Sequence, residues 1–117
     1  MKKLLVALLF SGSAFAGTLE QAAEVMCDYQ GSQREMNACA IRDYKASDAD
    51  LNAVYKKKLA KLSVKQREAL KAQQRQWIQR RDARCSARKT GEGTNTTIDY
   101  LTCLESMTEV RTLQLLR

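Results

Sequence analysis

The single tryptophan, Trp77, lies in a long run of residues that contains neither glycine nor proline. Gln74, Arg81 and Cys85 are related to it by steps of three and four residues. On an α-helix this spacing places all four side chains along one face. Because such a stripe usually faces the interior of a protein, the pattern predicts the core face of a structural helix. The alternative is a binding surface built around Trp77 and its neighbouring arginines.

Capping boxes mark where helices begin. In each, Ser or Thr is followed three residues later by Glu or Gln, at Thr18–Gln21, Ser32–Glu35 and Ser63–Gln66. They predict a short helix that ends near Tyr29–Gly31, a long helix over about 33–62 and the Trp77 helix from there to about 88. A glycine-rich loop follows at 90–96. A last helix carries its apolar face on Ile98, Leu101, Leu104, Met107 and Leu115.

The apolar stripe of the long helix is interrupted once. It runs through Met36, Ala40, Tyr44, Leu51, Tyr55, Leu59 and Leu62. Ser47 stands where an apolar residue is due, and a bend near Ser47–Asp48 is one interpretation. No stretch alternates polar and apolar residues for long enough to predict a sheet. The predicted fold class is all-α, an up-and-down bundle of one short helix, two long antiparallel helices and a C-terminal helix.

The N-terminus predicts export. Two lysines precede the apolar run Leu4–Phe10, and Ala14-x-Ala16 provides a small-residue cleavage signal. This pattern is typical of a secretory signal peptide over residues 1–16. The apolar run is too short to span a bilayer, so an integral membrane protein is not expected. We expect residues 17–117 to form one domain in the periplasm or outside the cell.

The cysteines indicate covalent cross-links. Cys27, Cys39, Cys85 and Cys103 all lie after the export signal, in what is then an oxidising compartment. Three pairings are possible, and Cys27–Cys39 with Cys85–Cys103 is favoured because each pair brackets a predicted turn. A metal site is disfavoured, since the chain has neither a Cys-x-x-Cys motif nor a histidine. No cofactor is expected.

Charge is distributed unevenly along the chain. Residues 56–89 carry thirteen Lys or Arg and two acidic residues, whereas residues 17–55 have a net charge of −4 and residues 90–117 of −2. The acidic segments are expected to fold back on the basic helix and pair with it. The excess of +5 over residues 17–117 can still attract an anionic partner. Nucleic acid is not expected, because the basic residues fall on all sides of the helix and export removes that partner.

Catalysis is not expected. The chain lacks histidine, the commonest general base, and its cysteines are expected to be oxidised. Carboxylate pairs occur at Asp48/Asp50 and Glu105/Glu109. The second pair is spaced one helical turn apart, and exposed acidic residues at helical spacing are usually only solvated. Gly91-Glu-Gly93 lacks the strand and the lysine that a phosphate-binding loop requires. We therefore expect a binding protein and not an enzyme.

Several motifs together resemble the LprI-like family of small secreted bacterial proteins, named after a lysozyme-inhibiting member. The motifs follow Cys27 and are Met36–Ala40, Asp48–Tyr55, Gln74–Cys85 and Cys103–Arg111. The most specific combination is Trp77-Ile-x-x-Arg-Asp-x-x-Cys85 with Cys103-Leu-x-x-x-Thr-x-x-Arg111. The resemblance covers about residues 27–115 and implies a helical, disulfide-bonded domain, with lysozyme inhibition for some members.

The residues that this resemblance singles out have a structural explanation. They are Asn37, Asn52, Tyr55, Trp77, Arg81, Asp82, Thr108 and Arg111. Asn37 and Asn52 are fifteen residues apart, which places them on nearly the same face of one helix. Arg81 lies on the helix before the Cys85–Cys103 pair, and Thr108 and Arg111 lie on the helix after it. The faces that carry these three residues should meet where that pair joins the two helices. Because buried polar groups need partners, we expect the polar members to satisfy one another inside the bundle.

Because the resemblance implies lysozyme inhibition for some members, the leading hypothesis is a secreted binding protein whose partner is a lysozyme or another muramidase. Animal lysozymes are themselves basic, so a net charge of +5 provides no long-range steering toward them. Inhibition then requires a local acidic or polar element inserted into the carboxylate-lined cleft. The candidates are Asp43, Asp48 and Asp50 of the acidic N-terminal part, or the loop 90–96 with Glu92. The alternative is an envelope-associated protein that binds anionic cell-wall polymer or a lipid surface and has no enzyme target.

Overall fold

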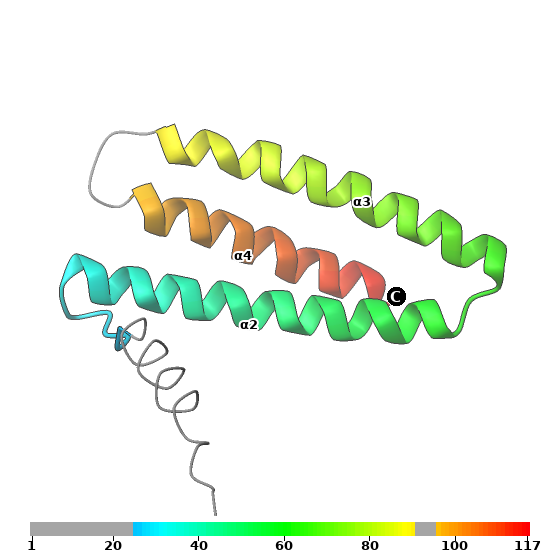
Figure 1. Cartoon of the computed structure of the whole chain (residues 1–117), viewed down its shortest axis with the longest axis horizontal. Helices are drawn as coiled ribbons and strands as arrows, with labels where there is room; N and C mark the ends of the chain where they lie inside the picture. The colour runs from blue at the N-terminus through cyan, green and yellow to red at the C-terminus, as the bar shows by residue number, and fades with distance from the viewer. Residues whose placement is uncertain (1–24, 91–95) are drawn as a thin grey trace, which may run out of the picture.

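The computed structural model describes residues 25–90 and 96–117, and all regular structure in this part of the chain is helical. The elements are α2 (Gln33–Ala60), α3 (Val64–Ser86), the short 3-10 helix η1 (Ala87–Thr90) and α4 (Thr96–Leu115). α2 and α4 run in the same direction, α3 runs in the opposite direction, and α4 packs against both (Figure 1). The predicted all-α bundle is confirmed. None of the described helices is long and apolar enough to cross a membrane.

Both long helices begin at their predicted capping boxes. Ser32 Oγ accepts a hydrogen bond from the Glu35 backbone N–H at 3.2 Å, and the Glu35 carboxylate accepts one from the Ser32 backbone N–H at 3.1 Å. The Ser32 backbone N–H and, second, the Ser32 hydroxyl donate hydrogen bonds to the Glu35 carboxylate and hold its pKa below its usual range. The box at Ser63 and Gln66 has the same reciprocal bonds. Because each box satisfies backbone N–H groups that a helix start leaves unpaired, α3 can begin only a short turn after α2 ends.

The predicted first helix lies for most of its length outside the described residues. Its predicted end near Tyr29–Gly31 is wrong, because residues 25–28 are not helical. Asp28 forms a local turn instead, in which its carboxylate accepts a hydrogen bond from the Gln30 backbone N–H at 2.8 Å. Short acidic side chains that bond to nearby backbone compete with helix formation, which explains the correction.

The apolar stripe of α2 faces the interior along its whole length. Ala40 and Leu51 are buried, and the other predicted stripe residues are half-buried. Ser47, at the interruption, is also buried and donates a hydrogen bond from Oγ to the Glu109 carboxylate of α4 at 3.3 Å. α2 continues unbroken through this point, so the serine marks an interhelical contact and not a break in the helix (Figure 1).

The two predicted disulfides, Cys27–Cys39 and Cys85–Cys103, are both present. Cys39 and Cys85 are fully buried. Cys39 lies in the first turns of α2, Cys85 near the end of α3 and Cys103 in the first half of α4, all toward the same end of the bundle (Figure 1). The disulfides therefore fasten one end of the bundle covalently.

The hydrophobic core lies in the middle and toward the other end. Its buried members come from all three long helices and are Leu51, Leu70, Trp77 and Leu115, with Val54, Tyr55, Leu59, Leu62 and Met107 packed against them. Trp77 is 7% exposed, and Gln74, Arg81 and Cys85 of the same stripe are buried with it. The core position that the spacing predicts for Trp77 is confirmed.

Replacing Trp77 with alanine is expected to destabilise the fold by about 3–5 kcal/mol, because it removes the largest side chain of a small core. The measurement is urea unfolding of the oxidised protein. Ile78→Ala is the matched control, since Ile78 is the next residue and is 38% exposed; its loss should stay below about 1 kcal/mol. Equal stabilities of the two variants would contradict the core position of Trp77.

Candidate functional site

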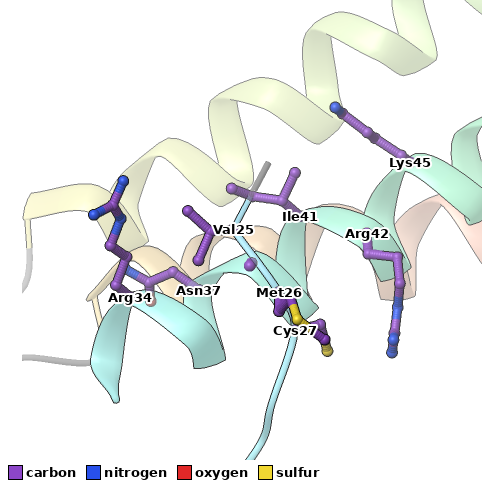
Figure 2. A pocket seen from close by; sticks show the side chains of 9 residues that line it. Val25, Met26, Cys27, Arg34, Asn37, Ile41, Arg42 and Lys45 are labelled. Atoms are coloured by element: carbon purple, nitrogen blue, oxygen red, sulfur yellow. The ribbon is translucent and has the colours of Figure 1, made fainter. Parts of the chain in front are cut away.

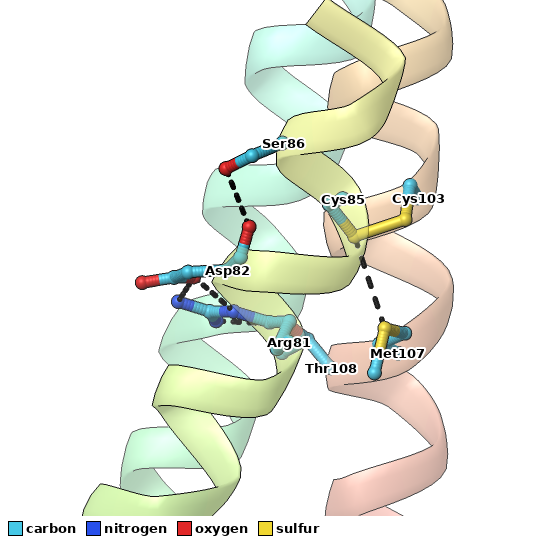
Figure 3. A network of polar contacts seen from close by, with 7 residues as sticks. All are labelled: Arg81, Asp82, Cys85, Ser86, Cys103, Met107 and Thr108. Carbon is cyan, nitrogen blue, oxygen red and sulfur yellow. Dashed lines mark hydrogen bonds and ion pairs between the residues drawn. A yellow bond between two sulfur atoms is a disulfide. The ribbon is translucent and has the colours of Figure 1, made fainter.

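Arg81 is a buried charged residue in contact with all three long helices. It is 8% exposed, and its Nη1 donates a hydrogen bond to Thr108 Oγ1 at 3.2 Å. Its Nη2 also pairs with the Asp82 carboxylate at 2.9 Å (Figure 3). The guanidinium lies 5.1 Å from the ring centre of Trp77 and 5.8 Å from that of Tyr44. Because a buried charge needs partners, this set explains how α3 carries an arginine on its core face.

Arg111 of α4 extends the same network. Its guanidinium lies 5.8 Å from the Trp77 ring centre, and its Nε donates a hydrogen bond to Gln74 Oε1 at 2.9 Å. Partial burial lowers the pKa of Arg111. The bond between Arg81 and Thr108 confirms the prediction that these faces of α3 and α4 are in contact. Arg111 also joins the two helices, through its bond to Gln74.

The two asparagines do not join this network, which corrects the expectation for them. Asn37 accepts a hydrogen bond from Gln33 Nε2 at 2.9 Å, and Asn52 donates one to the Asp48 carboxylate at 3.4 Å. Each partner lies one turn away on α2, where side chains four residues apart meet without help from another helix. Tyr55, by contrast, packs against the hydrophobic core as a half-buried residue.

Carboxylates gather where one side of α2 meets α4, and we call this surface the acidic edge. It consists of Asp43 and Asp50 of α2 with Glu105 and Glu109 of α4. The pKa of Glu105 is raised by partial burial and by the nearby negative charges of Glu109 and Asp43. Asp50 follows Asp43 by seven residues and therefore lies on the same face of α2. Ser47 joins the two helices at this edge through its bond to Glu109.

Asp43 is held in place by two neighbours. The Tyr29 hydroxyl donates a hydrogen bond to its carboxylate, and Arg42 pairs with it at 2.9 Å. The bond from Tyr29 is the main reason why the pKa of Asp43 is lowered, and the same bond raises the pKa of Tyr29. Asp43 therefore stays ionised to a lower pH than an ordinary aspartate.

The four residues that the sequence offers as binding candidates do not lie together. Asp43 and Asp50 belong to the acidic edge, but Asp48 lies on the other side of the buried stripe of α2, where it bonds to Asn52. Glu92 lies outside the described residues. Glu105 and Glu109, which the sequence places on a solvated surface, complete the edge because α4 packs beside Asp43. Within the described residues, no group of three or more potential ligands is arranged to hold a metal ion.

The predicted pairing of the basic helix with the flanking acidic segments is not observed in the described part of the chain. The ion pairs that α3 forms there are Lys71 with Glu68 and Arg81 with Asp82, both internal to α3. The carboxylates of the acidic edge lie where α2 meets α4, and none of them forms an ion pair with a lysine or arginine of α3 in the described residues. The molecule therefore presents basic and acidic surfaces separately.

The bond between Arg81 and Thr108 is testable by a double-mutant cycle. Thr108→Val keeps the side-chain shape but leaves Arg81 Nη1 without its partner, so we expect a loss of about 1–3 kcal/mol. Arg81→Met should cost at least as much, because the buried threonine hydroxyl and the aromatic contacts lose the guanidinium. Urea unfolding of the single and double variants should give a coupling energy of about 0.5–3 kcal/mol, and additive losses would contradict the bond.

Stability should depend on the ionisation of Glu105. Because its folded-state pKa is raised, its contribution is fully present below the ordinary value of 4.5 and is lost as the pH rises through the folded-state pKa. Glu105→Gln should therefore stabilise the fold near pH 7, by about 0.2–0.5 kcal/mol for a like-charge pair one turn apart, and leave it unchanged well below pH 4.5. Urea unfolding at both pH values tests this prediction. Glu68→Gln is the control, because it also removes a carboxylate but loses a favourable ion pair with Lys71, so it should not stabilise the fold near pH 7.

Comparisons with known proteins agree with this architecture. The model of the family described as lysozyme inhibitor LprI matches residues 11–115. An uncharacterized protein of Rhizobium meliloti (strain 1021) is 32% identical over 110 residues, an alignment that covers 81% of this chain and 79% of the relative. No solved structure gives a significant match. Because the family match spans both disulfides and all three described α-helices, the chain belongs to the LprI family.

Proposed function

We propose that this protein binds a lysozyme and inhibits it, with the acidic edge as its contact surface. The observation that carries the proposal is the match to a lysozyme-inhibitor family over residues 11–115. The disulfides and the family fit an exported protein, which would meet such an enzyme outside the cytoplasm. The acidic edge supports the proposal because it offers a basic enzyme a local surface of opposite charge.

The acidic edge acts over short range. The chain as a whole is basic, with a net charge of +7, so it does not steer a basic enzyme from a distance. Charges in salt solution of physiological strength are screened beyond about 8 Å, and within that distance the local carboxylates decide the sign of the interaction. The edge then contacts the basic surface around the cleft of the enzyme and blocks the entry of the polysaccharide.

The carboxylates of the edge are held in position before a partner arrives. Tyr29 and Arg42 contact Asp43, and Ser47 contacts Glu109. A side chain that is already ordered loses less conformational entropy on binding, so a preorganised surface binds more tightly than a mobile one. Asp50 and Glu109 are exposed and available to a partner.

The buried network around Arg81 is assigned to the fold and not to the contact. Arg81 is 8% exposed and Thr108 is not exposed at all, so a partner protein has no access to their bond. Arg81 is also paired with Asp82, which leaves little of its charge for another carboxylate. The Arg81–Thr108 bond joins α3 to α4, and Arg81 also lies beside Tyr44 of α2. The acidic edge forms where α4 packs beside α2.

A second candidate function is favoured by the surface of α3. Exposed lysines and arginines lie on several of its sides, among them Lys65, Arg75, Arg80 and Arg84. Anionic cell-wall polymer or lipid headgroups would be attracted to this surface, with a steep dependence on salt. In that case the protein coats the envelope and has no enzyme target.

An inhibition assay with two different substrates distinguishes lysozyme inhibition from binding to the cell wall. The oxidised protein is titrated against several lysozyme types, with a neutral, soluble oligosaccharide and with whole cell walls as substrates. Direct inhibition should saturate and should affect both substrates for at least one lysozyme type. Inhibition that is seen only with cell walls and disappears in added salt would mean that α3 coats the anionic polymer, and the inhibitor proposal would be rejected.

Charge reversal then tests the surface. Glu109→Lys is expected to weaken inhibition by about tenfold or more, a change of about 1.4 kcal/mol in binding free energy. Glu68→Lys on α3 is the matched control, because it changes the net charge by the same amount at another exposed glutamate. Equal losses for the two variants would assign the effect to net charge alone, and an unchanged Glu109 variant would exclude the edge as the contact.

A further inference from the structure

An open groove lies on the outer face of α2. It forms between the segment 25–27 and the first turns of the helix, and its volume is about 770 Å³ (Figure 2). The Cys27–Cys39 disulfide ties the segment to α2 and so holds the two walls together. Ile41 in this groove is two residues before Asp43, which turns its side chain to nearly the opposite side of the helix. The apolar side of the groove is therefore turned away from the acidic edge, which the groove adjoins at Arg42, the ion-pair partner of Asp43.

The floor of the groove is apolar and partly open to solvent. It is lined by Val25, Met26, Ala38 and Ile41. Met26 is 81% exposed and Ile41 41% exposed, although both are large apolar residues. Figure 2 shows Val25 and Ile41 side by side between the charged residues at the ends of the groove. Such a concave apolar surface is a binding-site feature when polar groups of one kind surround it.

Among the described residues that line the groove, the charged ones are all cations. Arg34, Arg42 and Lys45 line it, and no carboxylate does so within the described residues. Arg42 is paired with Asp43, but Arg34 and Lys45 form no ion pair in the described part of the chain. Arg34 and Lys45 are eleven residues apart, which is about 16 Å along a helix. Each end of the groove therefore offers a positive charge to an anion.

We propose that this groove binds a single anionic amphiphile, with its hydrocarbon chain along Val25, Ala38 and Ile41 and its anionic head at Arg34 or Lys45. The charge and the apolar floor together select this class of ligand. A peptide would also need several partners for its backbone groups. Among the described lining residues Asn37 is the one uncharged polar side chain, and its Oδ1 already accepts a bond from Gln33. A hydrocarbon chain needs no hydrogen-bond partner.

Binding is measured by calorimetry with the oxidised protein and dodecanoate below its micellar concentration. We expect saturable, one-to-one binding, and little or none with dodecyltrimethylammonium, which has the same chain and the opposite charge. Lengthening the chain from eight to twelve carbons should tighten binding by roughly twofold or more per CH₂, because each added group is partly buried. Equal binding of the cationic amphiphile would overturn the proposal.

Matched variants locate the site. Ile41→Glu should weaken dodecanoate binding by at least about tenfold, whereas Ile78→Glu on α3, at similar exposure, should not change it. The double variant Arg34→Gln with Lys45→Gln should also bind weakly, and Lys65→Gln with Arg75→Gln should bind as the unaltered protein does. Equal effects of groove and control variants would place any binding elsewhere and would overturn the proposal.

Other occupants are tested in the same experiment. If vesicles of phosphatidylglycerol bind but free dodecanoate does not, the groove is a membrane-contact surface and not a ligand site. If an acidic peptide with apolar side chains binds and dodecanoate does not, the occupant is a protein segment. Either result would reject the proposal that the groove binds a single anionic amphiphile. The proposal does not rest on lysozyme inhibition, since Glu109→Lys should leave dodecanoate binding unchanged.

Discussion

The arrangement of the three long helices depends on one buried charge. Arg81 of α3 donates a hydrogen bond to Thr108 of α4, lies beside the Tyr44 ring of α2 and pairs with Asp82 on its own helix. A buried guanidinium without partners would cost several kcal/mol, so sliding one helix along another is opposed at this point. The apolar contacts on either side are less specific, because a Leu or Met side chain accepts many neighbours. Arg81 thus sets the register in which the apolar residues pack.

The bundle is stabilised differently on the two sides of this contact. Toward one end the disulfides Cys27–Cys39 and Cys85–Cys103 restrain the chain, and toward the other the core around Leu51, Trp77 and Leu115 excludes water. A domain of this length buries a modest fraction of its surface, and small exported domains commonly add disulfides for that reason.

Two surfaces of opposite character result from this architecture. The acidic edge forms where α4 approaches α2, and the groove around Ile41 forms where the disulfide holds the segment 25–27 against the outer face of α2. The first suits a basic protein, and the second suits a small anionic amphiphile. Membership of the LprI family supports the proposal that the acidic edge binds a lysozyme. The proposal that the groove binds an amphiphile does not depend on the family. The two surfaces lie on different sides of α2 and adjoin at Arg42, which lines the groove and pairs with Asp43 of the acidic edge.

The sequence by itself determined α2, α3 and α4, the capping boxes of α2 and α3 and the core position of Trp77, and it favoured the observed disulfide pairs among three possible pairings, because these depend on local spacing along a single chain. The stripe of Gln74, Trp77, Arg81 and Cys85 is visible in the sequence as a face. Only the tertiary structure decided which residues meet across helices. It placed Glu105 and Glu109 beside Asp43, left Asn37 and Asn52 with partners on their own helix, and kept the basic side chains of α3 away from the acidic edge. The physical reason is that helical spacing defines the direction of a side chain on its own helix. The rotation and the register of the neighbouring helix come from the packing of all three.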